Sequence, residues 1–302
     1  MKGNINFFSS ILVLYFFSSC KAQTISLVAE QAELVQVSNE YSFTEGPASD
    51  KDGNVYFTDQ PNNKILKWNS NNNSLSVFKE PSGRANGLYF DHSGKLLAAA
   101  DEKNEIWRID ENGNVDTLIT NFENKKLNGP NDLWVDPRGG IYFTDPYYQR
   151  PYWDRTTAEI TTKNVYYIAP NLKTISIAAT DFVQPNGIIG TPDGKTLYVA
   201  DIGDQKTYSY TITKDGSLID RKLFTNMGSD GMTIDNKGNI YLTGNGVTIF
   251  NSKGEKIHHI PINEEWTANV TFGGKNQDIL FITAKGTVYT LQMDVTGVRY
   301  TN

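Results

Sequence analysis

The sequence lacks the side chains on which several common hydrolytic centres depend. Its 302 residues include only one cysteine, Cys20, and only three histidines, His92, His258 and His259. No Gly-x-Ser-x-Gly motif occurs, so the serine nucleophile of an α/β-hydrolase is not indicated. The histidines fall in expected turns or outer strands, and Cys20 lies in an N-terminal leader. The sequence therefore does not support a cysteine–histidine pair or a histidine-based centre.

Positive charge is also scarce. Lysine and arginine number 28 against 34 aspartates and glutamates, the formal net charge is −6, and no basic run occurs. Nucleic acid is therefore not an expected partner. No apolar segment of about 10–15 residues follows the 3.6-residue period of a helix, which argues against an α/β fold. Hydrophobic residues make up 38% of the chain, which is enough for a sizeable core.

Residues 1–22 are predicted to be a signal peptide. Lys2 precedes an apolar run over residues 7–17 that is too short to span a bilayer. The following residues allow two interpretations: a bacterial lipoprotein box in which Cys20 is lipidated, or cleavage after Ala22 by an ordinary signal peptidase. In both cases we expect export to the periplasm or anchoring at the outer membrane, with membrane contact only through a lipid on Cys20.

A hairpin at residues 127–145 shows the pattern on which the chain is built. Leu133–Val135 and residues 141–144 are rich in β-branched and aromatic residues, as strands are. Between them, residues 136–140 read Asp-Pro-Arg-Gly-Gly, which is turn chemistry. The hairpin should bring Asn131 and Asp145 to the same edge of the sheet.

Five further segments repeat this arrangement. Their first polar residues, with that of the hairpin, stand at positions 45, 86, 131, 186, 230 and 269, at intervals of 41, 45, 55, 44 and 39. A period of about 40–50 residues built from short strands is typical of a β-propeller with one four-stranded sheet per repeat. We predict an all-β, six-bladed propeller in a single domain over residues 24–302, and we expect a monomer.

The two ends of the predicted ring raise the question of closure. Only three clear strands follow Asn269, whereas residues 34–37 form an apolar segment ahead of the first repeat. We predict that residues 34–37 supply the outer strand of the last blade, which removes an unpaired edge. The alternative is a disordered leader.

The interval of 55 residues marks an insertion in the third blade, from Pro146 to about Lys163. It is rich in tyrosine, tryptophan and arginine. Aromatic faces suit the C–H faces of a sugar, and arginines suit carboxylates or hydroxyls. We therefore expect this loop to overhang the edge that carries Asn131, with a self-packed surface loop as the alternative.

The residue that opens each innermost strand should point toward the axis at one mouth of the channel. All six of these residues carry a side-chain oxygen: Glu45, Asn86, Asn131, Asn186, Asp230 and Asn269. Converging carboxylate and amide oxygens are the ligands of a hard cation such as Ca²⁺. The alternative is that Asn-Gly and Asp-Gly serve only as turn formers that tolerate positive φ.

These motifs together resemble the SMP-30/gluconolactonase/luciferin-regenerating family over residues 40–300. The resemblance rests on the segments at residues 45–47, 127–132, 184–187, 229–232, 268–274 and 280–284. It implies one divalent metal on the axis, most readily Ca²⁺, with Zn²⁺, Mg²⁺ or Mn²⁺ also possible. The metal ligands that it implies are Glu45, Asn131, Asn186 and Asp230.

The resemblance also implies hydrolysis of a sugar lactone, with the metal polarising the carbonyl and Asp230 acting as general base. A metal-bound carboxylate is a weak base, which is a difficulty for that role. Gly129 stands where the animal branch has a substrate-binding arginine, so the substrate of that branch is not implied. The bacterial gluconolactonase-like branch is closer, because it shares the Asn-x-Pro-Asn-Asp pattern found at residues 128–132. The expected substrate-binding residues are Asn86, Asn128, Asp145, Tyr147, Tyr148, Arg150, Trp153 and Asp201; for Asp145 and Asp201, capping of a turn is an equal alternative.

Two other functions remain open at this point. The chain could be a non-catalytic sugar-binding propeller of the cell envelope with a structural metal. The same site could also hydrolyse a phosphotriester or a modified glycoside.

Overall fold

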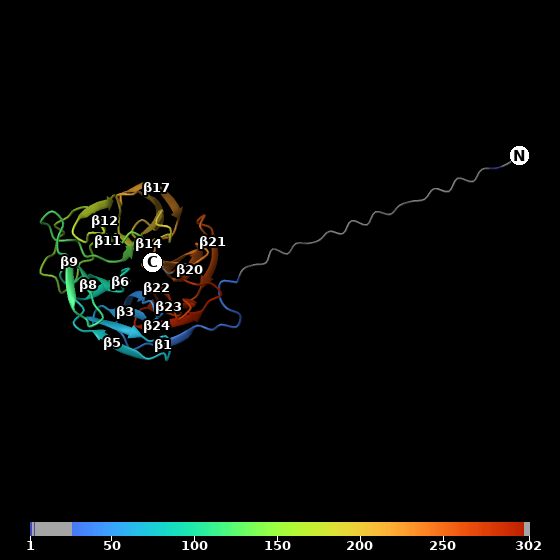
Figure 1. Cartoon of the computed structure of the whole chain (residues 1–302), viewed down its shortest axis with the longest axis horizontal. Coiled ribbons are helices and arrows are strands. Elements are labelled where there is room, and N and C mark those ends of the chain that lie inside the picture. Colours follow the sequence, from blue (N-terminus) through green and yellow to red (C-terminus); the bar gives the residue numbers. More distant parts are fainter. Residues whose placement is uncertain (2, 4–25, 299–302) are drawn as a thin grey trace.

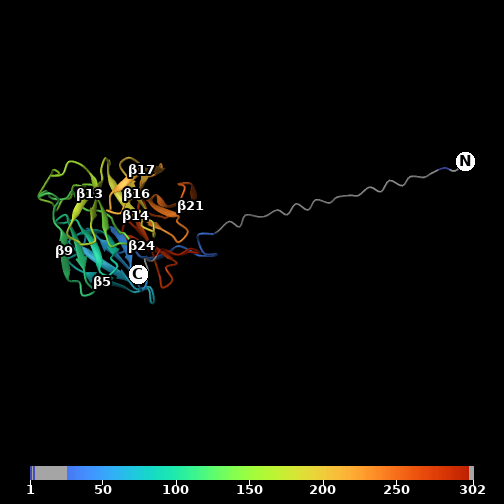
Figure 2. The same cartoon turned by 45° about the horizontal axis from the view of Figure 1, so that its top comes forward.

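The computed structural model describes residues 1, 3 and 26–298, and it shows six β-sheets arranged in a ring (Figure 1). Each sheet has four antiparallel strands. A view turned by 45° shows the same sheets standing around the central axis (Figure 2). The predicted six-bladed propeller is confirmed. The signal-peptide and Cys20 predictions lie outside the described residues.

The strands follow one another outward from the axis in each blade. The first two blades contain β2 (Thr44–Ser49), β3 (Val55–Asp59), β4 (Lys64–Trp68) and β5 (Leu75–Lys79), then β6 (Ala85–Phe90), β7 (Leu96–Ala100), β8 (Glu105–Ile109) and β9 (Val115–Ile119). The next two contain β10 (Leu133–Val135), β11 (Ile141–Asp145), β12 (Asn164–Ile168) and β13 (Ile175–Ala179), then β14 (Pro185–Gly190), β15 (Thr196–Asp201), β16 (Lys206–Ile212) and β17 (Leu218–Thr225). The last two contain β18 (Met232–Ile234), β19 (Ile240–Gly244), β20 (Gly246–Phe250) and β21 (Lys256–Ile260), then β22 (Thr267–Gly273), β23 (Ile279–Ala284), β24 (Thr287–Gln292) and, from the N-terminal side, β1 (Val35–Ser38).

Burial decreases from the axis to the rim. All five residues of β3 and of β11 are buried, whereas the outer strands β5 and β13 are mostly exposed or half-buried. β3 and β11 each begin with three consecutive apolar residues, because both of their faces pack against neighbouring blades. Trp134 shows how close this packing is: a Cβ on Gly190 of the next blade would lie 2.3 Å from its ring.

An N-terminal strand closes the ring. β1 pairs antiparallel with β24, with Val35 opposite Thr290 and Gln36 opposite Tyr289. The predicted closing strand is confirmed, one residue later in the chain than expected. The Thr44 hydroxyl at the start of the first blade also donates to the Thr287 carbonyl of the last, at 3.0 Å.

No helix occurs among the described residues, and none of these residues forms a helical segment long and apolar enough to cross a bilayer.

Candidate active site

The six residues predicted to open the inner strands do gather at one end of the channel. We call them the ring residues: Glu45, Asn86, Asn131, Asn186, Asp230 and Asn269. Five of them are buried, with 1–6% of their surface exposed, and Asp230 is half-buried. They lie at the start of β2, β6, β14 and β22 and just before β10 and β18.

Hydrogen bonds between blades fix the main chain of three ring residues, Asn86, Asn131 and Asn186. The Thr58 hydroxyl donates to the Asn86 carbonyl of the next blade at 3.0 Å, and the Thr144 hydroxyl donates to the Asn186 carbonyl at 2.8 Å. The Gly87 N–H donates to the Asn131 carbonyl at 2.8 Å. In each of these bonds, a donor in the preceding blade holds the backbone of a ring residue. The side chain of that ring residue is therefore free to line the mouth.

The glycines that follow the ring residues allow neighbouring blades to pack closely at the mouth. Gly87, Gly187 and Gly231 have no positive φ. A Cβ on Gly87 would lie 2.4 Å from the Asn131 carbonyl oxygen, and one on Gly231 would lie 1.9 Å from the Asn269 side chain. At these three positions the turn-former alternative is wrong, because glycine is needed for space and not for its backbone conformation.

Asp230 is held by hydrogen bonds on both of its carboxylate oxygens. Trp266 donates its ring N–H to Oδ2 at 2.6 Å, and the Asn186 amide donates to Oδ1 at 2.7 Å. The same amide donates to the Tyr148 hydroxyl at 3.0 Å. The Asn186 Oδ1 atom is buried and has no hydrogen-bond partner. This arrangement leaves an amide oxygen next to a fixed carboxylate.

A second group of bonded side chains lies beside the first. The Asn269 amide donates to Glu45 Oε2 at 3.1 Å and to Asp132 Oδ2 at 3.1 Å. The Gly46 N–H also donates to Glu45 Oε2, at 2.7 Å. Asp132 and Trp266 were missed by the sequence analysis. Asp132 could have been found as the acid next to Asn131 in the repeat, whereas Trp266 precedes β22 in a loop without a motif.

Three carboxyl groups are crowded here, and their pKa values rise. Burial, and then the charges of Asp230 and Asp132, raise the pKa of Glu45 well above its ordinary value. Burial raises the pKa of Asp132 to about 8 and that of Asp230 to about 6. Crowded buried carboxylates favour a positively charged occupant.

The residues present fit a hard cation. Two carboxylates, Glu45 and Asp230, and the unpartnered Asn186 oxygen are ligands that Ca²⁺ accepts. No three acidic, histidine or cysteine side chains in the described part of the chain are placed to hold one ion together. A cation would therefore depend on the amide oxygens of Asn131 and Asn186 as well as on the two acids.

The inserted loop lies between β11 and β12, over residues 146–163 as expected. It packs on itself and also reaches the mouth. Arg155 stacks 4.6 Å from the Trp153 ring centroid and donates to the Asn128 carbonyl at 2.8 Å. Tyr148 from the same loop bonds to Asn186. The loop therefore reaches the edge that carries the ring residues and is also self-packed, so the expectation and its alternative both hold.

Several predicted substrate-binding residues make hydrogen bonds within the protein. Asp145 accepts the N–H groups of Asn128 and Gly129 at 2.8 Å, and Asp201 accepts those of Val183 and Gln184 at 2.8 and 2.7 Å. Both aspartates thus cap loops, which is the alternative noted above. Asn128 is likewise buried and donates to the Thr162 carbonyl. Substrate contact by these three residues stays a prediction that the geometry does not favour.

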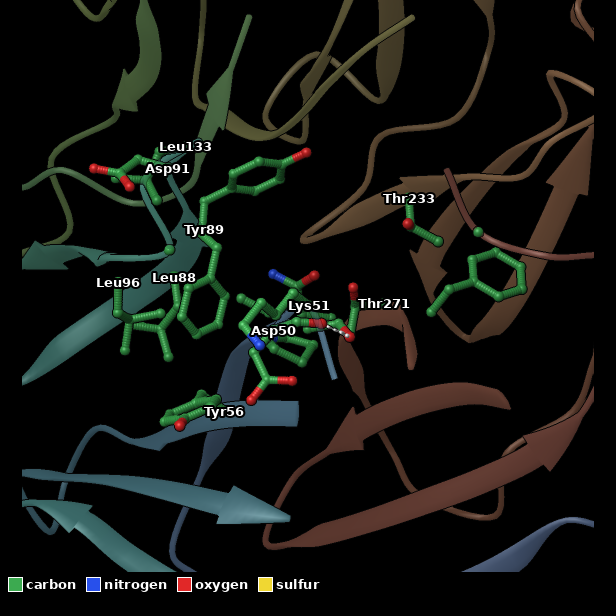
Figure 3. A pocket seen from close by; sticks show the side chains of 18 of the residues that line it. Asp50, Lys51, Tyr56, Leu88, Tyr89, Asp91, Leu96, Leu133, Thr233 and Thr271 are labelled. Atoms are coloured by element: carbon green, nitrogen blue, oxygen red, sulfur yellow. Dashed lines mark hydrogen bonds between the residues drawn. The ribbon is translucent and has the colours of Figure 1, made fainter. Parts of the chain in front are cut away.

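A cavity of about 760 Å³ lies along the inner strands, next to the ring residues. Asp132 and Asn269 form its inner end, and the far ends of the inner strands line the rest. Figure 3 shows Tyr56 and Tyr89 of the first two blades on one side of this cavity, and Thr233 and Thr271 on another. Asp132 and Asn269 thus line this cavity and also belong to the hydrogen-bonded group that contains Glu45.

Comparison with known proteins places this geometry in context. A family model described as "SMP-30/Gluconolactonase/LRE-like region" matches residues 43–286. The gluconolactonase of Zymomonas mobilis is 28% identical over 292 residues, covering 86% of this chain and 81% of that protein. XC5397, a gluconolactonase from Xanthomonas campestris, superposes with a TM-score of 0.83 at 27% identity, over 90% of this chain and 92% of that structure. The calcium-binding protein regucalcin from Agrobacterium tumefaciens has the same fold, with a TM-score of 0.74 at 19% identity over 91% of this chain and 96% of that structure.

Proposed function

Because the chain belongs to the SMP-30/gluconolactonase/LRE-like family, we propose that it opens a sugar lactone by hydrolysis at the mouth formed by the ring residues. The observation that carries this proposal is the placement of Asp230. Its carboxylate is fixed by Trp266 and Asn186, and it stands beside a buried amide oxygen that has no partner within the protein. A module that only binds sugar has no need of a carboxylate fixed in this way.

A divalent cation, Ca²⁺ by ligand type, would be held by Glu45, Asn131, Asn186 and Asp230. When bound, it supplies positive charge that polarises a lactone carbonyl and favours the developing oxyanion. The similarity to gluconolactonases and the set of oxygen ligands support this part of the proposal.

The chain's own residues handle the proton. Asp230 accepts a proton from the attacking water as the water oxygen bonds to the carbonyl carbon. The bond between that carbon and the ring oxygen then breaks, and the ring oxygen takes a proton back from Asp230. One water is consumed and a hydroxy acid is released. Trp266 and Asn186 keep the carboxylate in one orientation during both transfers.

Replacement of Asp230 tests the proposal. Asp230→Asn keeps an oxygen for the cation and removes the basic carboxylate, so we expect lactone hydrolysis to fall by about 10²–10⁴. Glu45→Gln removes one charge from the same mouth, and we expect weaker cation binding with activity recovered at high Ca²⁺. Asp116→Asn, on exposed β9, is the control and should hydrolyse lactones like the parent.

The measurement is a panel of sugar lactones, beginning with gluconolactone, assayed with Ca²⁺ and with chelator. An Asp230→Asn variant as active as the parent would show that Asp230 is not the base. If the parent opens no lactone in the presence of metal, the hydrolase proposal fails. A sugar-binding module, or a hydrolase of phosphotriesters or modified glycosides, then takes its place.

We also propose that the protein is exported and works as a monomer. The apolar leader and Cys20 support export, with a lipid anchor as one form of it. Mass spectrometry of the mature N-terminus distinguishes the two forms: a lipidated Cys20 indicates an anchor, and an unmodified Gln23 indicates simple secretion. An uncleaved Met1 form in the cytosol would contradict both.

A further inference from the structure

A second pocket, of about 520 Å³, opens beside the mouth. Six residues line it: Gln60, Pro61, Arg84, Arg150, Pro151 and Tyr152. Two of the six are arginines, and none is acidic. The pocket joins the end of the first blade to the inserted loop of the third, so residues distant in the sequence meet in it.

Arg84 is held in the pocket wall with donor groups to spare. Its guanidinium stacks 4.5 Å from the Tyr152 ring centroid, and Nη1 donates to the Pro61 carbonyl at 2.9 Å. Its Nε is buried, makes no hydrogen bond and forms an ion pair with the Glu102 carboxylate at 3.8 Å, so only the outer N–H groups can face a ligand. The Arg84 backbone has φ +49°, an uncommon conformation for a residue other than glycine. Such strain is often kept at binding sites.

Arg150 is oriented by a carboxylate that has little capacity left. Its Nε donates to Asp101 Oδ2 at 2.8 Å. The same oxygen accepts the Tyr152 hydroxyl at 2.6 Å and the Gln60 amide at 3.2 Å. Within the described chain, Nε makes the only side-chain hydrogen bond of Arg150. The terminal N–H groups of this fork therefore remain for a ligand.

Arg150 also connects the pocket to the proposed active site. Its guanidinium lies 5.5 Å from the Tyr148 ring centroid, and the Tyr148 hydroxyl accepts the amide of Asn186. A ligand that fills the pocket is thus one side chain away from the ring residues.

We propose that this pocket, formed by Arg84, Arg150, Tyr152 and Gln60, binds the phosphate group of a phosphorylated substrate. Asp101 and Glu102 offset part of the charge of the two guanidinium groups, which leaves the geometry of their remaining N–H donors as the main match. Arginine pairs with phosphate through parallel hydrogen bonds, and such a fork suits phosphate oxygens. That the phosphate is carried by a sugar lactone rests on the proposed function. Binding of the anion itself does not.

Titration calorimetry on the full chain tests the pocket directly. The probes are inorganic phosphate and a phosphorylated aldonate, with acetate and the unphosphorylated aldonate as carboxylate comparisons. We expect Arg84→Gln and Arg150→Gln to weaken the binding of both phosphate probes by about tenfold or more, since each removes charge-assisted hydrogen bonds. Arg84→Lys keeps the charge without the fork, and we expect partial loss.

Arg221→Gln is the matched control. Arg221 also stacks on an aromatic ring, 3.9 Å from the Tyr208 centroid, but it lies on the outer strand β17 and should bind phosphate like the parent. Parent protein that binds no phosphate, or variants that bind it as tightly as the parent, would overturn the proposal. Carboxylate probes binding in place of phosphate would also overturn it.

Hydrolysis of a neutral lactone by the same preparations separates this inference from the proposed function. If the parent opens a neutral lactone and binds no phosphate, only the pocket inference fails. If it binds phosphate through Arg84 and Arg150 and opens no lactone, neutral or phosphorylated, the proposed function fails and the anion pocket remains.

Discussion

At the scale of single residues, Asn269 joins two acidic side chains that belong to different blades. Its amide donates to both Glu45 and Asp132, and its own oxygen accepts the Val270 N–H at 2.8 Å. Without this donor, two buried carboxyl groups would face each other with fewer hydrogen bonds. Unpaired buried polar groups are costly, so Asn269 should stabilise the mouth in the absence of cation.

Replacement of Asn269 by alanine tests this role. We expect the free energy of unfolding in chelator to fall by about 1–3 kcal/mol, the cost of leaving buried acceptors unsatisfied. Denaturant titration followed by fluorescence gives the value. Asn276→Ala, at an exposed position in the β22–β23 turn, should change it by less than about 0.5 kcal/mol. An equal effect of the two changes would contradict the role assigned to Asn269.

The sequence predicts the residues of the mouth better than it predicts their partners. Glu45, Asn186 and Asp230 could be found because each stands at the same phase of a repeat. Their hydrogen bonds to Asn269 and Trp266 could not, because these join different blades and one pair is 224 residues apart in the chain. Contacts of this kind depend on how the ring closes, which a local pattern does not encode.

At the scale of elements, β1 has a role out of proportion to its four residues. It covers the free edge of β24, and its Val37, together with Tyr41 just after the strand, packs against the cluster that contains Phe57 and Phe281. It thus ties the N-terminal segment to both the last and the first blade.

Removal of β1 should weaken the whole ring. We compare a chain that begins at Tyr41 with one that begins at Ser26, which keeps β1. The shorter chain loses half-buried apolar side chains such as Leu27, Leu34 and Val37, and we expect it to be less stable by about 3 kcal/mol or more. It also exposes a strand edge, so it should self-associate in size-exclusion chromatography. Equal stability of the two chains would show that the closing strand is dispensable.

For the inserted loop, the sequence predicts the ends of the element but not its internal packing. The limits of the inserted loop follow from the long interval between repeats, and the structure confirms them. Its internal packing, such as Arg155 against Trp153, depends on the shape of the surface onto which the loop folds. Likewise, the aspartates that close the second strands were recognised as candidates, but their burial as loop caps became evident only in three dimensions.

At the scale of the whole molecule, the proposed cation would bridge four blades. Its ligands Glu45, Asn131, Asn186 and Asp230 come from the first, third, fourth and fifth repeats. Only the assembled ring offers them together, so binding should stabilise the native state and not the unfolded chain.

Ca²⁺ should therefore raise the stability of the entire domain. At a concentration of about 100 times Kd we expect a gain of roughly 2.7 kcal/mol over chelator. Thermal denaturation in both conditions measures it. The Glu45→Gln variant should show a smaller shift at the same Ca²⁺ concentration. A parent protein with identical stability in Ca²⁺ and chelator would contradict the site.

The propeller was predictable from the sequence because each repeat shows the strand pattern of one blade. The cavity of about 760 Å³ was not predictable. It depends on how the far ends of six inner strands leave space between them, and on where Gly297 and Val298 come to lie. No single repeat carries that information.

The glycines beside the ring residues have a consequence for how such a mouth can change over time. Gly87 leaves room for the Asn131 carbonyl of the next blade, and Gly231 leaves room for the Asn269 side chain. The width of the mouth thus depends on how closely neighbouring blades pack at these glycines. In a lineage built on this frame, ring side chains that join blades, as Asn269 does, are therefore less free to change than those that would contact only a ligand.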